Sequence, residues 1–75
     1  MNNRQRKKID TMLSKLEKIQ GEINDMSAEE QEKYDNLPES IQDSDRGSDM
    51  ENSIEYLDEA ANLIDDVIDN LNSAK

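Results

Sequence analysis

The chain has 75 residues and a mass of 8.6 kDa, and its 19 Asp and Glu against nine Lys and Arg give a net charge of −10. It contains no Cys and no His, which excludes a thiol nucleophile, an imidazole base, the usual zinc sites and a disulfide framework. We therefore expect one small domain over residues 1–75 that is no enzyme and has no catalytic residue, metal site or cofactor.

Large apolar residues are few in the chain as a whole, but in its first third they are regularly spaced. The whole chain has only seven Ile, six Leu and one Val, a composition typical of disorder. Steps of three and four residues nevertheless form an a/d stripe of a helix at Ile9, Met12, Leu16, Ile19, Ile23 and Met26. This stripe predicts a helix over about residues 3–25. Gly21 lies opposite the stripe, where no packing is lost.

A second stripe with the same period lies in the last third of the chain, at Met50, Ile54, Leu57, Ala61, Ile64, Ile68 and Leu71. It predicts a helix over about residues 48–72, whose start is indicated by the capping box Ser48-x-x-Glu51. Leu13, Leu63 and Val67 widen the two stripes beyond what a pair of helices needs, so we expect a third surface to pack against them.

The segment between the stripes is polar. A second capping box, Ser27-x-x-Glu30, predicts a short helix at about residues 28–35, and Pro38 then breaks the helical pattern. We expect a single turn at residues 38–42 and a mobile loop from there to residue 47.

Charge is distributed unevenly and favours an antiparallel arrangement. Residues 1–24 carry a net charge of +3, whereas residues 25–75 carry −13. Bases at the start of the first helix and Asp65, Asp66 and Asp69 near the end of the second each oppose their own helix dipole, and side by side they offset one another. The predicted fold class is all-α, an antiparallel helical hairpin with a short helical insert. A head-to-tail pair of chains would bring the same groups together.

A lone hairpin of this size buries little apolar surface, so we expect two hairpins to form a four-helix bundle homodimer. The residues predicted to line the oligomer seam are Leu13, Leu16, Ile54, Leu57, Ile64 and Ile68.

The predicted second helix is rich in carboxylates and has no base before Lys75. Such a surface suits a basic site on a protein partner, and an exposed aromatic beside it suits a contact. The contact residues predicted on this basis are Tyr56, Asp58, Glu59, Asp65 and Asp66. The simpler interpretation is that the charged face only keeps a small helical protein soluble.

Three other patterns are weaker. The basic run Arg4–Lys8 has no interleaved aromatic residue and belongs to an anionic chain, so we expect no binding to nucleic acid. The alternating carboxylates from Asp43 place Gly47 one position too early for an EF-hand loop and Ile54 where its Glu belongs. Carboxylate pairs at one-turn spacing, such as those that hold magnesium in all-α nucleotide pyrophosphatases, are expected by chance in so acidic a chain.

No apolar run is long enough for a membrane span, and the first residues lack the apolar region of a secretion signal. We therefore expect a cytoplasmic protein without membrane contact.

The stretch from Tyr34 to Gly47, with Asn36-Leu37-Pro38-Glu39-Ser40-Ile41 at its centre, and the helices around it resemble small uncharacterised acidic proteins of phages and prophages of Gram-positive bacteria. The resemblance implies that the chain functions in a bacterial host. It also implies that the chain is an inhibitor that binds and blocks a host protein, for example a defence nuclease. It carries no chemistry residue by residue. The alternative function is a structural or assembly module whose coiled-coil seam is itself the interface.

Overall fold

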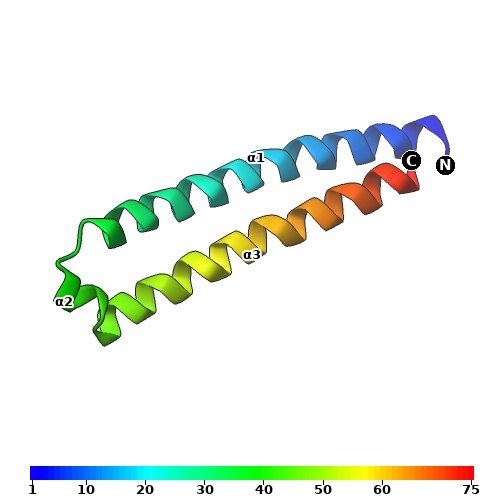
Figure 1. The fold of residues 1–75 in the computed structure, drawn as a ribbon. Coiled ribbons are helices and arrows are strands. Elements are labelled where there is room, and N and C mark those ends of the chain that lie inside the picture. Colours follow the sequence, from blue (N-terminus) through cyan, green and yellow to red (C-terminus); the bar gives the residue numbers. More distant parts are fainter.

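The computed structural model describes all 75 residues and contains three helices and no strand. The helices are α1 (Asn3–Asp35), α2 (Glu39–Gln42) and α3 (Asp45–Ala74). The long helices α1 and α3 lie side by side and antiparallel, so that both chain termini lie at one end and α2 at the other (Figure 1). The predicted all-α hairpin with a short helical insert is thus confirmed.

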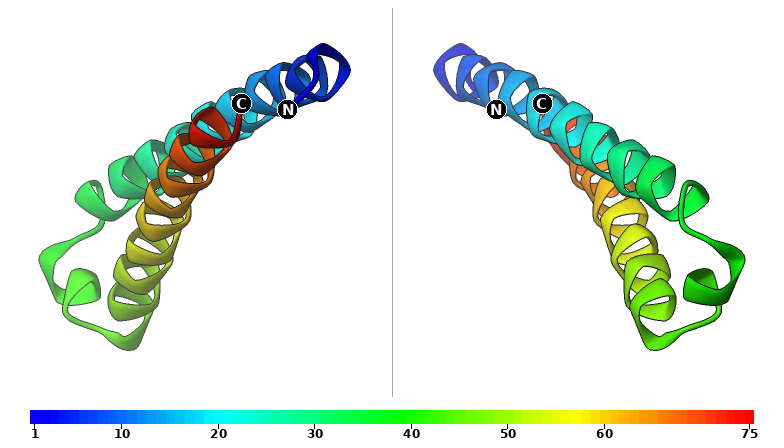
Figure 2. Two further views of the ribbon diagram at one scale, coloured as in Figure 1. Left: turned by 90° about the vertical axis from the view of Figure 1, so that its right-hand side faces the viewer. Right: turned by 90° about the vertical axis from the view of Figure 1, so that its left-hand side faces the viewer.

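The hairpin is a rod of 58 × 15 × 11 Å. In the two side views of Figure 2, the axes of α1 and α3 diverge toward α2. We call the end with the chain termini the termini end and the end with α2 the loop end. Neither long helix is apolar enough over a sufficient length to cross a membrane.

Helix α1 is longer than the sequence predicted, because the separate helix expected at residues 28–35 is its continuation. Residues 26–28 contain neither Gly nor Pro, so nothing local interrupts the helix there. Ser27 does not act as a cap; it is buried in the interior of α1. The helix ends where Pro38 disfavours a helical conformation at Leu37, and Asn36 is its C-cap. At the other end, the side chain of Asn2 accepts a hydrogen bond of 2.9 Å from the amide of Gln5.

Helix α3 begins at Asp45, one turn before the predicted start, with Ser44 as the N-cap residue. The loop expected to be mobile up to residue 47 is therefore partly helical. Gly47 lies in the first turn and is buried, and a Cβ at this position would stand 2.0 Å from the main-chain oxygen of Gln42. Only glycine allows this close approach of the two backbones.

The side of α1 that faces α3 differs from the predicted stripe. Buried and half-buried residues recur at positions a and e, namely Ile9, Leu13, Leu16, Gln20, Ile23, Ser27, Glu30 and Tyr34. Met12, Ile19 and Met26, predicted to lie in the stripe, are 44, 46 and 55% exposed. The contact surface of α1 is thus rotated by about one residue. Polar Gln20 and Ser27 occupy positions that an apolar pattern cannot identify.

On α3 the predicted stripe does face α1, with Ile54 and Ala61 buried and the other five residues half-buried. The six residues predicted for an oligomer seam line this contact between α1 and α3 of one chain. Leu13 and Ile54 are buried, and Leu16, Leu57, Ile64 and Ile68 are half-buried. The core is thin, because no side chain is fully buried and the buried apolar residues are Ile9, Leu13, Ile54 and Ala61.

Candidate interaction surfaces

One edge of the α1–α3 contact is closed by polar side chains. The amide nitrogen of Gln20 donates to the main-chain oxygen of Ala61 at 2.9 Å and to the carboxylate of Asp65 at 2.6 Å. The hydroxyl of Ser27 donates to the carboxylate of Asp58 at 2.5 Å. Bonds that end on a carboxylate are stronger than those between neutral groups. These bonds therefore fix the register of the two helices.

Tyr34 of α1 makes a similar hydrogen bond to a carboxylate of α3, closer to the loop end. Its hydroxyl donates a hydrogen bond to the carboxylate of Glu51, and this bond raises the pKa of the phenol above its ordinary value. Loss of water around the ring and the negative charges of Glu51, Asp43 and Asp35 act in the same direction. The main-chain oxygen of Tyr34 also accepts from the side chain of Gln42 at 2.9 Å, which ties α2 to α1.

The structure does not bring the five predicted contact residues together on one surface. Asp58 and Asp65 bind α1 side chains at the polar edge. Glu59 and Asp66 are exposed and lie on the side of α3 away from α1. Tyr56 is 73% exposed and lies two residues from Asp58, which places it on nearly the opposite side of the helix.

Glu59 and Asp66 belong to a row of exposed carboxylates along the outer side of α3. We define the acidic ridge as Glu55, Glu59, Asp66 and Asp69, which are spaced by four, seven and three residues and so share one side of the helix. The ion pairs of the chain are Lys33 with Glu30 at 3.4 Å and Lys75 with Asp10 at 2.6 Å. The carboxylates of the ridge thus have no basic partner within the chain. Glu55 and Asp69 were not among the predicted contact residues, although their spacing from Glu59 and Asp66 indicates the shared side.

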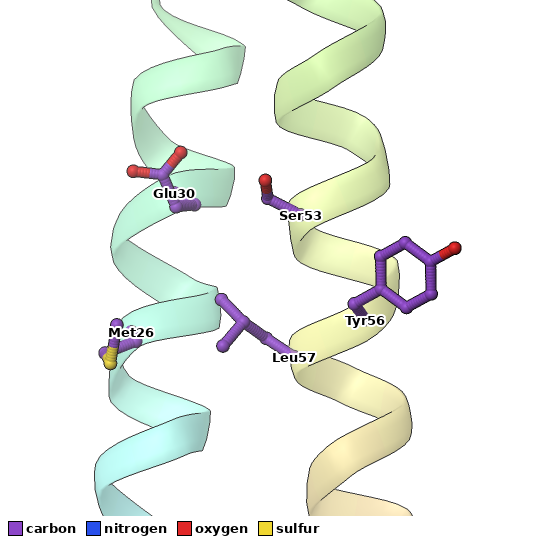
Figure 3. A pocket seen from close by; sticks show the side chains of 5 residues that line it. All are labelled: Met26, Glu30, Ser53, Tyr56 and Leu57. Atoms are coloured by element: carbon purple, nitrogen blue, oxygen red, sulfur yellow. The ribbon is translucent and has the colours of Figure 1, made fainter.

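A second surface is apolar. Met26 and Tyr56 line an open depression of about 480 Å³ together with Glu30, Ser53 and Leu57, so they lie on the same side of the hairpin (Figure 3). Ile19 and Met12 precede Met26 by two and four turns, and Leu63 and Val67 follow Tyr56 by two and three turns. All six are exposed, and we define them as the apolar face: Met12, Ile19, Met26, Tyr56, Leu63 and Val67.

The bases at the start of α1 were expected to lie beside Asp65, Asp66 and Asp69 and to offset their charge, but the polar contacts at this end involve Lys75 instead. Arg6 donates to the main-chain oxygen of Lys75 at 3.1 Å, and Lys75 pairs with Asp10. No ion pair joins α1 to Asp65, Asp66 or Asp69.

No group of three or more carboxylates converges in a way that could hold a metal ion. Comparison with protein-family models, curated proteins and solved structures gives no match for this chain. The acidic ridge and the apolar face are therefore the two surfaces of the hairpin that are free to bind another molecule.

Proposed function

We propose that the chain is a non-enzymatic binding protein that presents the acidic ridge to a basic site on a protein partner. The observation that carries this proposal is the row of four exposed carboxylates on α3 with no ion pair inside the chain. From Glu55 to Asp69 the ridge extends about 21 Å along a rigid helix. Fixed charges on such a scaffold accelerate encounter with a complementary surface and select against partners of like charge.

The acidic ridge refines the set of contact residues. Glu59 and Asp66 are free to meet a partner, whereas Asp58 and Asp65 already accept hydrogen bonds from α1. A partner that engaged Asp58 or Asp65 would have to displace Ser27 or Gln20. We therefore assign the first role to the ridge and a supporting electrostatic role to Asp58 and Asp65.

The test compares two double variants with equal changes in charge. Glu59→Gln with Asp66→Asn neutralises the ridge; Asp25→Asn with Glu32→Gln neutralises two exposed carboxylates of α1 with the same seven-residue spacing. A partner captured by the wild-type chain is purified, and its Kd is measured by calorimetry at low and high salt. We expect the ridge variant to raise Kd by about tenfold or more, with little change for the α1 variant. Equal weakening by both variants would contradict a role for the ridge.

In the phage setting that the sequence resemblance implies, the partner is a host defence nuclease and the ridge competes with nucleic acid for its basic groove. Carboxylates in a row can occupy sites that otherwise bind phosphates. The prediction is inhibition of DNA cleavage that is relieved by excess DNA and lost in the ridge variant. Inhibition that is independent of DNA concentration would argue against competition.

The apolar face favours a second candidate function, a structural or assembly module. Exposed large apolar side chains that gather on one side of a protein are typical of interaction sites. The seam residues Leu57 and Ile64 face α1 within one chain, so a charge there would unfold the hairpin and would not isolate this function. Replacing Leu63 by Glu, on the apolar face, tests it without disturbing the contact between α1 and α3.

A further inference from the structure

The hairpin alone leaves much apolar surface uncovered. Its radius of gyration is 17.2 Å, whereas a compact chain of this length would have about 11 Å. Six of its seven exposed large apolar side chains lie on the apolar face, and the seventh is Met1. The broad side of the rod measures 58 by 15 Å, so a molecule lying along it covers on the order of 800 Å² per partner, as in stable interfaces.

The two ends of the rod carry opposite charge. The hydrogen bond between Gln20 and Asp65 divides the rod into a termini side and a loop side. On the termini side, residues 1–19 and 66–75 have seven bases and four acids; on the loop side, residues 20–65 have two bases and 15 acids. A copy lying in the same direction would place two strongly negative loop ends together. A copy lying head to tail would place each negative loop end against a positive termini end.

The apolar face is also self-complementary in the head-to-tail arrangement. Ile19 lies midway between Met12 and Met26 in the sequence, so a two-fold axis at the level of Ile19 sets Ile19 against its own copy and Met12 against Met26 of the second copy. On α3 the level of Ile19 corresponds to Asp66, because cross-helix pairs such as Gln20 with Asp65 and Ser27 with Asp58 fix the register.

The residues of α3 agree with this axis. Leu63 and Val67 are centred on Asp65, one residue or about 1.5 Å from the level of Ile19, so Leu63 meets Val67 of the second copy. The same axis brings Lys15 near Glu22 and Lys8 near Glu29 of the second copy, both at the border of the apolar face. Apolar and charged residues therefore select the same arrangement, as an isologous interface requires.

We propose that the apolar face binds a second copy of this chain head to tail, with α1 on α1 and α3 on α3, to form an antiparallel four-helix bundle. The exposed Met12, Ile19, Met26, Leu63 and Val67 become its second core layer, beside the α1–α3 contact of each hairpin. The acidic ridges of the two α3 helices then lie along the same side of the bundle. This proposal stands independently of the protein partner proposed above.

Cysteine cross-linking tests the arrangement, because the chain has no cysteine of its own. Ile19→Cys treated with a short bismaleimide is expected to give a covalent dimer at high yield. Met12→Cys and Met26→Cys are each expected to give little self-cross-linking, because the two copies of the same residue lie 14 positions or about 21 Å apart along the bundle. A mixture of the two variants is expected to cross-link to each other. Glu17→Cys, exposed elsewhere on α1, is the control for random collision.

Light scattering supplies the second readout. The wild-type chain is expected to have twice the monomer mass, Leu63→Glu the monomer mass, and Asn62→Glu, exposed on another side of α3, the mass of the wild type. Circular dichroism establishes that Leu63→Glu remains helical. A helical wild-type monomer would overturn the proposal. A dimer in which Ile19→Cys cross-links no better than Glu17→Cys would overturn the head-to-tail arrangement, and so would efficient self-cross-linking of Met12→Cys.

Discussion

The two ends of the hairpin are held together by different means. At the termini end, α1 contributes apolar Ile9, Leu13 and Leu16 to the contact with α3. At the loop end, it contributes Ser27 and Tyr34, whose hydroxyls bind carboxylates of α3. Apolar burial is tolerant of small shifts, whereas a hydrogen bond between named atoms is not. The side chains of α1 thus contribute mainly apolar burial at the termini end, where Arg6 and Asp10 also bind Lys75, whereas at the loop end they fix the register of the two helices.

The strongest test of the loop end is Gly47→Ala. The new methyl group would stand 2.0 Å from the main-chain oxygen of Gln42, so α2 must move away from α3. We expect a loss of about 3 kcal/mol in the free energy of unfolding, the upper range for overpacking. Urea unfolding at fixed protein concentration measures it. Gly21→Ala is the control, because no heavy atom lies within 4 Å of its Cβ and alanine favours the helix. A similar loss in both variants would contradict the close approach at Gly47.

At the termini end, Leu13→Ala removes a side chain that is 8% exposed. We expect a loss of about 2 kcal/mol, the lower range for such truncations, because the two-helix core is thin and can partly close around the gap. The fall in Tm can be followed by circular dichroism. Glu17→Ala, exposed on α1, is expected to change Tm little. An equal Tm for both variants would mean that Leu13 is not part of the core.

Ser27→Ala isolates the contribution of one polar contact. Removing the hydroxyl takes the hydrogen bond away from Asp58, and we expect a loss of about 1 kcal/mol. The matched control is Ser14→Ala, an exposed position of the same helix, which corrects for the higher helix propensity of alanine. If Ser27→Ala were as stable as Ser14→Ala, the hydrogen bond to Asp58 would contribute nothing net.

The smallest expected effect on stability is the contribution of the Tyr34 phenol, which changes at alkaline pH. The raised pKa of Tyr34 means that the folded chain keeps the phenol proton at a pH where the unfolded chain loses it. The stability from this group is fully present below the ordinary tyrosine pKa of about 10 and is lost as pH rises through the folded value. Wild type should therefore lose more stability than Tyr34→Phe between pH 9 and pH 11, as measured by urea unfolding. Parallel curves for the two proteins would contradict the contact with Glu51.

The side of α3 that faces α1 could be predicted from the sequence, whereas the corresponding side of α1 could be predicted only in part. On α3 every buried or half-buried position is apolar apart from the buried glycine, so periodicity alone identified the side that faces α1. On α1 the apolar residues form two adjacent rows. The row through Met12, Ile19 and Met26 completed a regular a/d pattern, although the structure leaves it exposed. Gln20 and Ser27 take the contact positions because their partners lie on α3, which a local pattern does not reveal.

The helix boundaries and the candidate site show the same limit. Ser27 and Ser48 each begin a capping-box pattern, yet both lie inside longer helices. The carboxylates of α3 are evident from the sequence, but their division into hydrogen-bonded Asp58 and Asp65 and free Glu59 and Asp66 depends on where α1 lies.

The hairpin geometry has a consequence for the order of folding. The sequence separation of cross-helix hydrogen bonds grows steadily along the rod, from 17 for Tyr34 with Glu51 through 31 for Ser27 with Asp58 to 69 for Arg6 with Lys75. Closing a short loop costs less conformational entropy than closing a long one. The contacts between α1 and α3 are therefore expected to form first near α2 and last near the chain termini. Substitutions at Gly47 should then slow folding, whereas substitutions at Leu13 should mainly accelerate unfolding.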